Sequence, residues 1–290
     1  MASSLILNEL MDLLPEIASH HSPLGKLQPF LKKVARREIE ALFADQKSRA
    51  VSFPICGKLR FPYFKMGAVD SLNLFDIDEL IIFSFYWLNR TTYRKVVDIG
   101  ANIGLHSIIL NHCGYKVRCF EPDPVHFKLL QRNLALNDCK NVIPENAAVS
   151  SKTGVMEFIR VLGNTTGSHI AGSKTNPYGK LEKFPVKVEA FKQIVKGVDL
   201  MKIDAEGHER EILLSTDAAD WRKLDVMIEV QNIGNARTLF AHFKKMKVNL
   251  FAQKINWQQV KSVKDMPVGY KEGSLFITSK SEMPWHSKGR

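Results

Sequence analysis

The apolar positions of this chain follow two different periods, and the change between them divides the chain into elements. From residue 93 onward, short apolar runs rich in β-branched residues alternate with amphipathic stretches of helical period. The runs predict strands near 95–99, 116–120, 141–149, 198–203 and 225–230. The amphipathic stretches predict helices at about 104–112, 124–137 and 207–215. This alternation is typical of right-handed βαβ units and a largely parallel sheet.

Residues 153–190 interrupt the alternation. The segments VMEFIRV and FPVKVEA predict a strand pair around a glycine-containing loop. Residues 162–170 of that loop fit a lid that closes over a ligand and equally a plain hairpin connection. Near the end, LFAQKI and SLFITS predict two more strands that form an antiparallel edge. We therefore predict an α/β fold with a Rossmann-like, doubly wound, mostly parallel sheet and an antiparallel edge.

The first 90 residues have a different pattern. Residues 1–50 carry helical periodicity, residues 51–69 look like short strands punctuated by proline and glycine, and residues 76–88 predict a helix. We predict a small helical and strand N-terminal segment over residues 1–90, a Rossmann-like domain over 91–280, and a loose tail over 281–290.

Composition indicates an ordinary globular protein. Hydrophobic residues make up 45% of the 290 positions and charged residues 24%. The four cysteines form no metal-binding or disulfide-framework spacing, so we expect free thiols. The N-terminal apolar stretch contains Glu9 and Asp12 and predicts an amphipathic helix rather than a signal peptide. The longest apolar run, residues 80–88, is too short to span a bilayer. We expect a cytoplasmic protein without a membrane span.

The net charge of +11 is concentrated in the last stretch of the chain. Residues 231–290 hold 11 Lys/Arg against 3 Asp/Glu, an excess of +8. One interpretation is a solvated surface. The other is a basic surface beside the active site that attracts an anionic substrate. Its members would be Lys244, Lys245, Lys247, Lys254, Lys261, Lys264 and Lys271.

The stretch VVDIGANIGLH, residues 96–106, predicts a ligand site at the carboxyl end of a strand. Gly100 and Gly104 allow a close turn, and the following helix begins with free N–H groups. Asp98 suits a cationic group, and Glu121, one unit later, can accept hydrogen bonds from ribose hydroxyls. A dinucleotide fingerprint would need two more glycines. The pattern fits S-adenosylmethionine, with a plain α/β packing turn as the alternative.

A second dense cluster is LMKIDAEGHERE, residues 200–211, in which Asp204, Glu206 and His208 are the catalytic candidates. Methyl transfer to oxygen needs an aligned nucleophile that loses its proton, which a carboxylate or an imidazole can accept. The alternative is that these acids only stabilise a helix start, with Glu209 closing a capping arrangement. For His208, facing a ligand and being merely exposed are both open.

Three neighbouring residues have roles that the sequence leaves open. Lys202, on a buried strand, should point toward an acid partner or contact the acceptor. His106 is either a base or a satisfied polar contact beside the site. Glu229 should stand beside Asp204, and with Glu206 the three carboxylates could hold a Mg²⁺ ion. The motif does not require a metal, and we assign no metal ligands.

The motifs VVDIGANIGLHS, FEPDP, ENAAVSSKTG and MKIDAEGHEREIL together resemble the FkbM-type methyltransferases, a branch of the class I S-adenosylmethionine-dependent enzymes. The resemblance covers about residues 93–231 and implies that residues 1–90 hold acceptor selectivity. It implies a cofactor site made by Asp98, Gly100, Ala101, Asn102, Gly104, Glu121, Pro122, Asn146, Ala147 and Asp204.

The resulting prediction is an enzyme that uses S-adenosylmethionine to methylate a hydroxyl on a sugar, a glycan or another small molecule. One alternative is methylation of RNA or protein, although the chain lacks an aromatic RNP-type strand pair and an N-P-P-Y motif. The other is a non-catalytic module that binds S-adenosylmethionine. The sequence does not specify an oligomeric state.

Overall fold

The computed structural model describes residues 2–44, 50–66, 69–162, 167–173 and 180–285. Its centre is an eight-stranded sheet with the order β16-β15-β17-β14-β13-β6-β7-β8. The strands are β6 (Lys95–Ile99), β7 (Lys116–Phe120), β8 (Val142–Glu145), β13 (Leu200–Ile203), β14 (Asp225–Ile228), β15 (Asn249–Ala252), β16 (Gln258–Gln259) and β17 (Leu275–Thr278). The predicted doubly wound sheet is confirmed.

Strand direction fixes where a ligand can enter the sheet. Strands β8, β7, β6, β13 and β14 pair in parallel. Because β6 pairs with β7 on one side and β13 on the other, the chain order reverses between β6 and β13. Ligands of open α/β sheets bind at such a switch point, beyond the carboxyl ends of the strands. The antiparallel strand β17 lies inside the sheet, between β14 and β15, and β16 forms the antiparallel edge.

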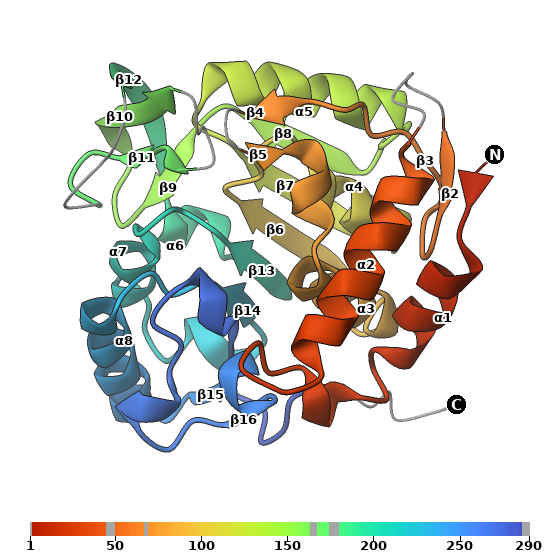
Figure 1. The fold of residues 1–290 in the computed structure, drawn as a ribbon. Helices are drawn as coiled ribbons and strands as arrows, with labels where there is room; N and C mark the ends of the chain where they lie inside the picture. Colours follow the sequence, from red (N-terminus) through yellow and green to blue (C-terminus); the bar gives the residue numbers. More distant parts are fainter. Residues whose placement is uncertain (1, 45–49, 67–68, 163–166, 174–179, 286–290) are drawn as a thin grey trace.

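Helices cover both faces of this sheet (Figure 1). The helices of the first half are α1 (Leu5–Leu13), α2 (Gln28–Leu42), α3 (Ile77–Leu88), α4 (Leu105–His112) and α5 (Pro124–Leu136). Those of the second half are α6 (Phe191–Ile194), α7 (Glu209–Leu214) and α8 (Ile233–Met246). The 3₁₀ turns are η1 (Ala18–His20), η2 (Ser71–Phe75), η4 (Asp220–Arg222), η5 (Gln253–Ile255), η6 (Val263–Asp265) and η7 (Tyr270–Glu272). Among the described residues, no helix has the length and apolar character needed to cross a membrane.

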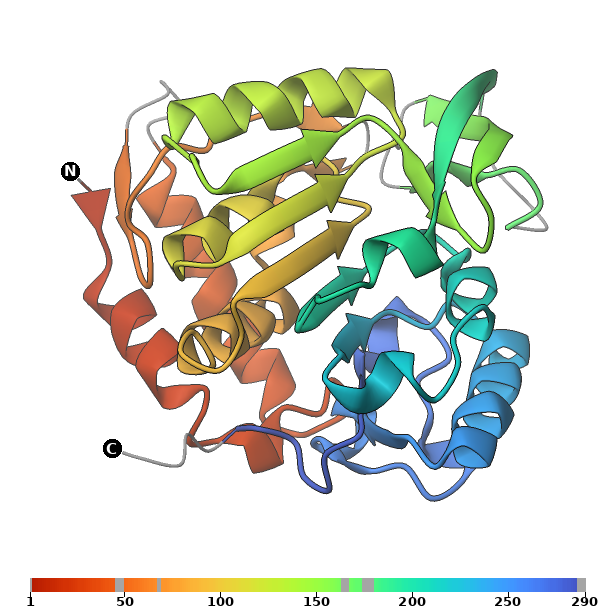
Figure 2. The same ribbon diagram turned by 180° about the vertical axis from the view of Figure 1, so that it is seen from behind.

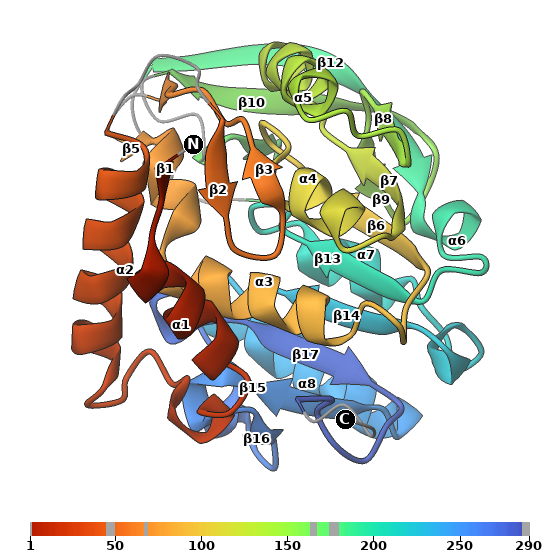
Figure 3. The same cartoon turned by 90° about the vertical axis from the view of Figure 1, so that its right-hand side faces the viewer.

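The N-terminal segment shares its core with the sheet. Leu7 of α1, Phe75 of η2 and Ile81 of α3 belong to one buried cluster with Ile108 and Ile109 of α4. Figures 1 and 3 show α1, α2 and α3 packed together on one side of the molecule. The short strands are β1 (Ala2–Ser3), β2 (Val51–Phe53), β3 (Gly57–Leu59), β4 (Lys65–Met66) and β5 (Val69–Asp70). This segment therefore covers the sheet rather than forming a separate core.

The single strand predicted over 141–149 is split in two. The chain leaves the central sheet after β8 and enters a second sheet of order β11-β10-β12-β9. Its strands are β9 (Ala148–Ser150), β10 (Gly154–Leu162), β11 (His169–Ile170) and β12 (Lys180–Ala190). The predicted strand pair is confirmed, because β10 and β12 are antiparallel with Phe158 opposite Phe184. Figure 2 shows the yellow and yellow-green strands β6–β8 running toward this green sheet. Residues 163–166 of the predicted lid lie outside the described residues.

The prediction of a loose C-terminal tail is wrong for residues 281–285. Trp285 is only 4% exposed, and its ring makes an edge contact with His21 at a centroid distance of 4.9 Å. A second edge contact joins Trp285 to Phe85 of α3. A large aromatic ring that buries this much apolar surface fixes the chain to the core. Residues 286–290 lie outside the described residues.

Candidate active site

Side-chain alternation along the parallel strands brings charged residues into one row. Successive residues of a strand face opposite sides of a sheet. Val96 and Leu200 face the core cluster that contains α3 and α4, so Asp98 and Lys202, two residues later, face the same side. Asp98 and Lys202 are direct neighbours across β6 and β13. Asp204 continues this alternation at the carboxyl end of β13. We call Asp98, Lys202 and Asp204 the charged row.

Gly100 brings the ends of β6 and β13 into close contact. Its φ of 78° lies in the left-handed region that favours glycine, and a Cβ at this position would lie 1.8 Å from the carbonyl oxygen of Asp204. The Asp204 N–H also donates to the Ile99 carbonyl at 2.9 Å. A side chain at position 100 would therefore push the two strand ends apart.

Glu121 closes the glycine loop from the end of β7. Its carboxylate accepts the N–H of Asn102 and the N–H of Asp123, each at 2.8 Å. Burial raises the pKa of Glu121 to about 8, against the opposing effect of these two hydrogen bonds. Each carboxylate oxygen can accept more than one hydrogen bond. The group can therefore still accept hydroxyl groups of a ligand.

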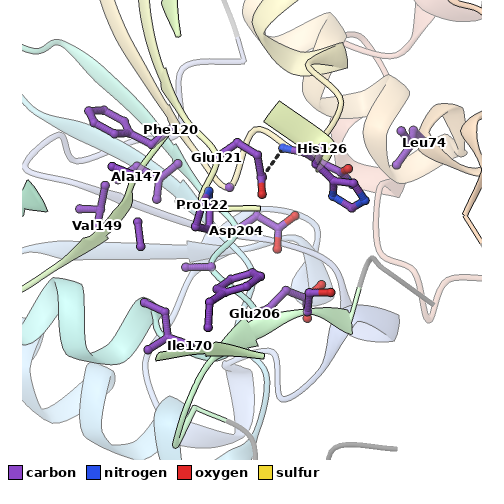
Figure 4. A pocket seen from close by; sticks show the side chains of 17 residues that line it. Leu74, Phe120, Glu121, Pro122, His126, Ala147, Val149, Ile170, Asp204 and Glu206 are labelled. Carbon is purple, nitrogen blue, oxygen red and sulfur yellow. Dashed lines mark hydrogen bonds between the residues drawn. The ribbon is translucent and has the colours of Figure 1, made fainter. Parts of the chain in front are cut away.

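A pocket opens beside Glu121 at the carboxyl ends of β6, β7 and β13. One wall is apolar and is formed by Phe120, Ala147, Ala148, Val149, Phe158 and Ile170. The other wall carries the carboxylates of Glu121, Asp204 and Glu206. Figure 4 shows these acids across from Phe120, Val149 and Ile170. An apolar slot with few polar groups at one end is typical of a small-molecule site.

Six of the predicted cofactor residues line this pocket: Gly100, Asn102, Glu121, Pro122, Ala147 and Asp204. The other four lie behind its lining. The Asn146 amide donates to the carbonyls of Glu121 and Pro122 and so fixes the segment after β7. Ala101 is buried, and Gly104 begins α4 with a φ of 92°.

Asp98 is the last of the four predicted cofactor residues that do not line the pocket. It is fully buried and accepts a hydrogen bond from the Ser107 hydroxyl at 2.7 Å. Its second oxygen, Oδ1, has no hydrogen-bond partner among the described residues, and neither has Oδ1 of Asn102. Buried acceptors without a partner are uncommon and call for an explanation. Two such oxygens beside the glycine loop suit a ligand that brings hydrogen-bond donors, such as an ammonium group. The residues present therefore fit S-adenosylmethionine.

Comparison with known proteins agrees with this geometry. Residues 98–252, which are 155 of the 290 residues, match the model of the "Methyltransferase FkbM domain" family. The chain belongs to the FkbM methyltransferase family. The predicted resemblance is thereby confirmed, and the matched region begins at Asp98, within the first motif, and contains the whole of the second, residues 200–211.

Two curated relatives show how far the family likeness extends. The chain is 28% identical over 171 residues to "Methyltransferase sdnD" of Sordaria araneosa, which covers 46% of this chain and 65% of the relative. It is 27% identical over 175 residues to "31-O-demethyl-FK506 methyltransferase FkbM" of Streptomyces tacrolimicus, with coverages of 49% and 66%. The chain thus spans just under two thirds of the length of these relatives.

Solved structures give weak matches. A SAM-dependent methyltransferase from Agrobacterium tumefaciens has a TM-score of 0.41 at 9% identity and covers 80% of this chain and 70% of its own. An O-methyltransferase from Bacillus cereus in complex with SAH has a TM-score of 0.33 at 12% identity, with coverages of 67% and 77%. We therefore describe the fold of this FkbM family member from the strand order of its own central sheet.

Lys202 and the carboxylates around it form the charged end of the site. Its ammonium lies 3.2 Å from Oδ2 of Asp204, as the sequence predicts for a lysine on a buried strand. Burial disfavours the ammonium, but Asp204, Asp98, Glu79 and Glu229 outweigh it and raise the pKa of Lys202 above its ordinary value. The acids of this row are therefore stabilised by a fixed cation.

Glu229 follows β14, whose Ile228 pairs with Ile203, so it lies beside Asp204 as predicted. Burial, then Asp204 and Glu79, raise the pKa of Glu229 well above its usual range. The described residues contain no group of three or more His, Cys, Asp or Glu side chains placed to hold a metal ion. The proposed Mg²⁺ site of Asp204, Glu206 and Glu229 is therefore not assembled in this FkbM domain.

Of the three catalytic candidates, Asp204 and Glu206 line the pocket and His208 does not. The His208 ring is buried between two hydroxyls, with Nε2 2.9 Å from Ser150 Oγ and Nδ1 3.1 Å from Ser173 Oγ. Neither sequence interpretation of His208, facing the ligand or being exposed, describes this position. The capping role is taken by Glu209, whose carboxylate accepts the N–H groups of Ala205 and Gly207.

Both ring nitrogens of His106 have partners, so His106 is not available as a base. Its Nε2 lies 2.8 Å from Oε2 of Glu79, and its Nδ1 lies 3.1 Å from the Tyr86 hydroxyl. Both partners come from α3. The contact therefore joins α3 to the first turn of α4, next to the charged row.

The position predicted for part of the basic surface is wrong. Lys244 and Lys245 end α8, and Lys247 precedes β15. Strand β15 is parallel to β14, since both are antiparallel to β17. The start of β15 therefore lies at the amino edge of the sheet, opposite Asp204. These three lysines cannot overlook the acceptor pocket.

Several pocket residues were not predicted from the sequence. They are Leu74, Ile99, Phe120, His126, Ala148, Val149, Phe158 and Ala205, whereas Ser168 and Ile170 belong to the segment 162–170 that the sequence offered as a lid or a hairpin connection. Most come from predicted strands or strand ends, so a signal existed for their secondary structure. No local signal indicated that the second sheet folds back over the end of β7.

Proposed function

We propose that this protein is an S-adenosylmethionine-dependent methyltransferase that methylates a hydroxyl oxygen of a small molecule or glycan. The observation that carries the proposal is the buried Glu121 at the end of β7, together with the unpartnered oxygens of Asp98 and Asn102 at the adjacent glycine loop. Glu121 would hold the ribose hydroxyls, and the two oxygens would hold the ammonium of the methionine end. The adenine would lie against the apolar wall that includes Phe120 and Ile170.

When bound, S-adenosylmethionine supplies a methyl group on a positively charged sulfur. Asp204 is the proposed base, because it lines the pocket at the end of β13. The Asp204 carboxylate would accept the hydroxyl proton of the acceptor as the acceptor oxygen is methylated. The Lys202 ammonium lies 3.2 Å from Oδ2 of this proposed base. General-base help of this kind contributes about 10²- to 10⁴-fold.

The charges at this end of the pocket favour an uncharged acceptor. Asp204, Asp98, Glu79 and Glu229 act electrostatically on Lys202, and Glu206 acts on Glu229, so the site is rich in carboxylates. An anionic acceptor would meet repulsion here. Three of the lysines that supported such an acceptor, Lys244, Lys245 and Lys247, lie at the opposite edge. We therefore propose a neutral hydroxyl compound and do not retain the anionic acceptor.

The test is isothermal titration calorimetry with S-adenosylmethionine. Above pH 8, where Glu121 is ionised, Glu121→Ala should weaken binding by about tenfold to more than a hundredfold, because loss of a charged hydrogen-bonding partner costs about 1.5–3 kcal/mol. Glu145→Ala is the matched control, since Glu145 ends the neighbouring strand and pairs with Arg118 outside the pocket. Equal affinity of wild type and Glu121→Ala would refute this cofactor site.

A further inference from the structure

The segment from Ile17 to Arg37 has an unusual charge pattern. Its 21 residues contain five basic side chains and no acidic one. They are Lys26, Lys32, Lys33, Arg36 and Arg37. Large apolar residues are interleaved with these charges. A basic and apolar surface of this composition is typical of proteins that bind the interface of a membrane.

The apolar residues of this segment are exposed although they are large. The exposed fraction is 62% for Leu24, 37% for Leu27 and 62% for Phe30. Lys26, Lys33 and Arg37 are also exposed, and none of them forms an ion pair with a described residue. Together these six residues form a surface that we call the basic-apolar patch: Leu24, Lys26, Leu27, Phe30, Lys33 and Arg37.

The patch lies on α2 and on the loop before it. Positions 30, 33 and 37 lie on one face of a helix, because residues three and four apart are neighbours. The opposite face of α2 is buried through Leu31, Ala35 and Ile39. Leu24, Leu27 and Phe30 therefore lie outside the hydrophobic core, which α2 contacts with its other face.

Strong contacts hold the patch in place. The Ser22 hydroxyl donates to the Lys254 carbonyl at 2.6 Å, and the Ser22 N–H donates to the Asn256 side chain at 2.7 Å. The Gln28 amide donates to the Asp78 carboxylate at 3.0 Å. An ordered surface loses less conformational entropy on binding than a flexible one. The patch is therefore an ordered surface.

These contacts also place the patch at the carboxyl edge of the sheet. Lys254 and Asn256 follow the carboxyl end of β15, and Asp78 lies in the first turn of α3. The next residue, Glu79, reaches His106 beside the charged row. The patch and Asp204 therefore belong to the same edge of the molecule.

We propose that the basic-apolar patch docks the protein on anionic lipid membranes. The lysines and the arginine match the charge of anionic headgroups, and Leu24, Leu27 and Phe30 can enter the apolar boundary beneath them. A second copy of the chain would bring like charges together. Docking would direct the carboxyl edge toward the bilayer, so that an amphipathic hydroxyl acceptor could reach Asp204. That last step rests on the proposed function, whereas docking itself does not.

The experiment is co-sedimentation of the full chain with vesicles of phosphatidylcholine alone or mixed with phosphatidylserine. The wild type should bind the mixed vesicles at least tenfold more tightly, and added salt should weaken binding because exposed charges are screened. Two variants should each reduce binding at least tenfold. One combines Leu24→Ser, Leu27→Ser and Phe30→Ser, and the other combines Lys26→Glu, Lys33→Glu and Arg37→Glu.

The matched control combines Ile143→Ser, Val155→Ser and Leu181→Ser, whose wild-type side chains are 61%, 71% and 38% exposed on other strands. It should bind vesicles like the wild type. Circular dichroism and S-adenosylmethionine titration would verify that every variant is folded. The proposal would be overturned if the wild type did not bind the mixed vesicles, or if both patch variants bound them as tightly as the wild type does. A concentration-dependent dimer that the patch variants abolish would also overturn it, and would make the patch an interface between copies.

Discussion

The two ends of the pocket differ in chemistry although they are joined by one glycine. At the β7 end, apolar side chains such as Phe120 and Ile170 surround a single buried acid, Glu121. At the β13 end, Lys202 lies among several carboxylates. Recognition of a flat, neutral ring needs the first environment, and proton transfer needs the second. Binding and chemistry should therefore respond separately to substitution, except where the two ends touch.

Gly100 is the place where the two ends touch, so its substitution should have the largest effect. Gly100→Ala would place a Cβ 1.8 Å from the Asp204 carbonyl oxygen. We expect loss of cofactor binding and of activity together, with destabilisation greater than the roughly 1–2 kcal/mol that a left-handed residue alone costs. Urea unfolding and calorimetry measure both.

The matched control is Gly114→Ala. Gly114 has a φ of 88°, close to the 78° of Gly100, but a Cβ there would meet nothing within 4 Å. It should show only the backbone cost and bind the cofactor normally. If both alanine variants lost the same stability, close packing at Gly100 would not be the reason for that glycine.

Asp204→Asn should separate chemistry from binding. We expect kcat to fall by about a hundredfold or more, because the amide cannot accept the hydroxyl proton. Cofactor affinity should change little. Glu211→Gln, on the neighbouring helix and outside the pocket, serves as the control. A variant that kept its kcat and only raised the acceptor KM would make Asp204 a structural residue.

The elements that form the cofactor end could largely be predicted from the sequence, because their signals are local. The β-branched run before Asp98 and the glycines after it define a strand, a turn and a helix start within eleven residues. The same holds for the strand that ends at Ile203. Their meeting at one edge then follows from the rule for parallel sheets.

What the sequence did not reveal depends on tertiary packing. Helix α8 has an apolar stripe of Ala236, Leu239 and Phe243, but it opens with Ile-Gly-Asn, which is typical of a turn. The orientation of His208 depends on Ser173, thirty-five residues earlier. Glu79 reaches the charged row only because α3 packs beside α4. The spacing of apolar and polar residues along the sequence does not indicate such contacts between distant residues.

Lys202→Met should change the pH dependence of activity rather than binding. The Lys202 ammonium faces Asp204 on its own strand, Asp98 on β6, Glu79 on α3 and Glu229 after β14. Without that cation, protonated carboxylates are favoured, so the acid limb of the kcat profile should move upward by about one pH unit or more. Lys202→Arg should restore the wild-type limb. An unchanged profile in Lys202→Met would remove Lys202 from the proton-transfer mechanism.

His208→Ala should have the smallest effect on activity, because His208 lies outside the pocket although the motif makes it a catalytic candidate. We expect kcat within about threefold of wild type and a stability loss of about 1–2 kcal/mol for the bonds to Ser150 and Ser173.

Burial lowers the pKa of His208 below 6.5. The unfolded chain therefore takes up a proton before the folded chain does, so the wild type should lose stability as pH falls below about 6.5. His208→Ala should lack this part of the acid destabilisation in thermal unfolding between pH 5 and 8. A collapse of kcat without loss of stability would instead assign His208 to the reaction and blur the division between the two ends of the pocket.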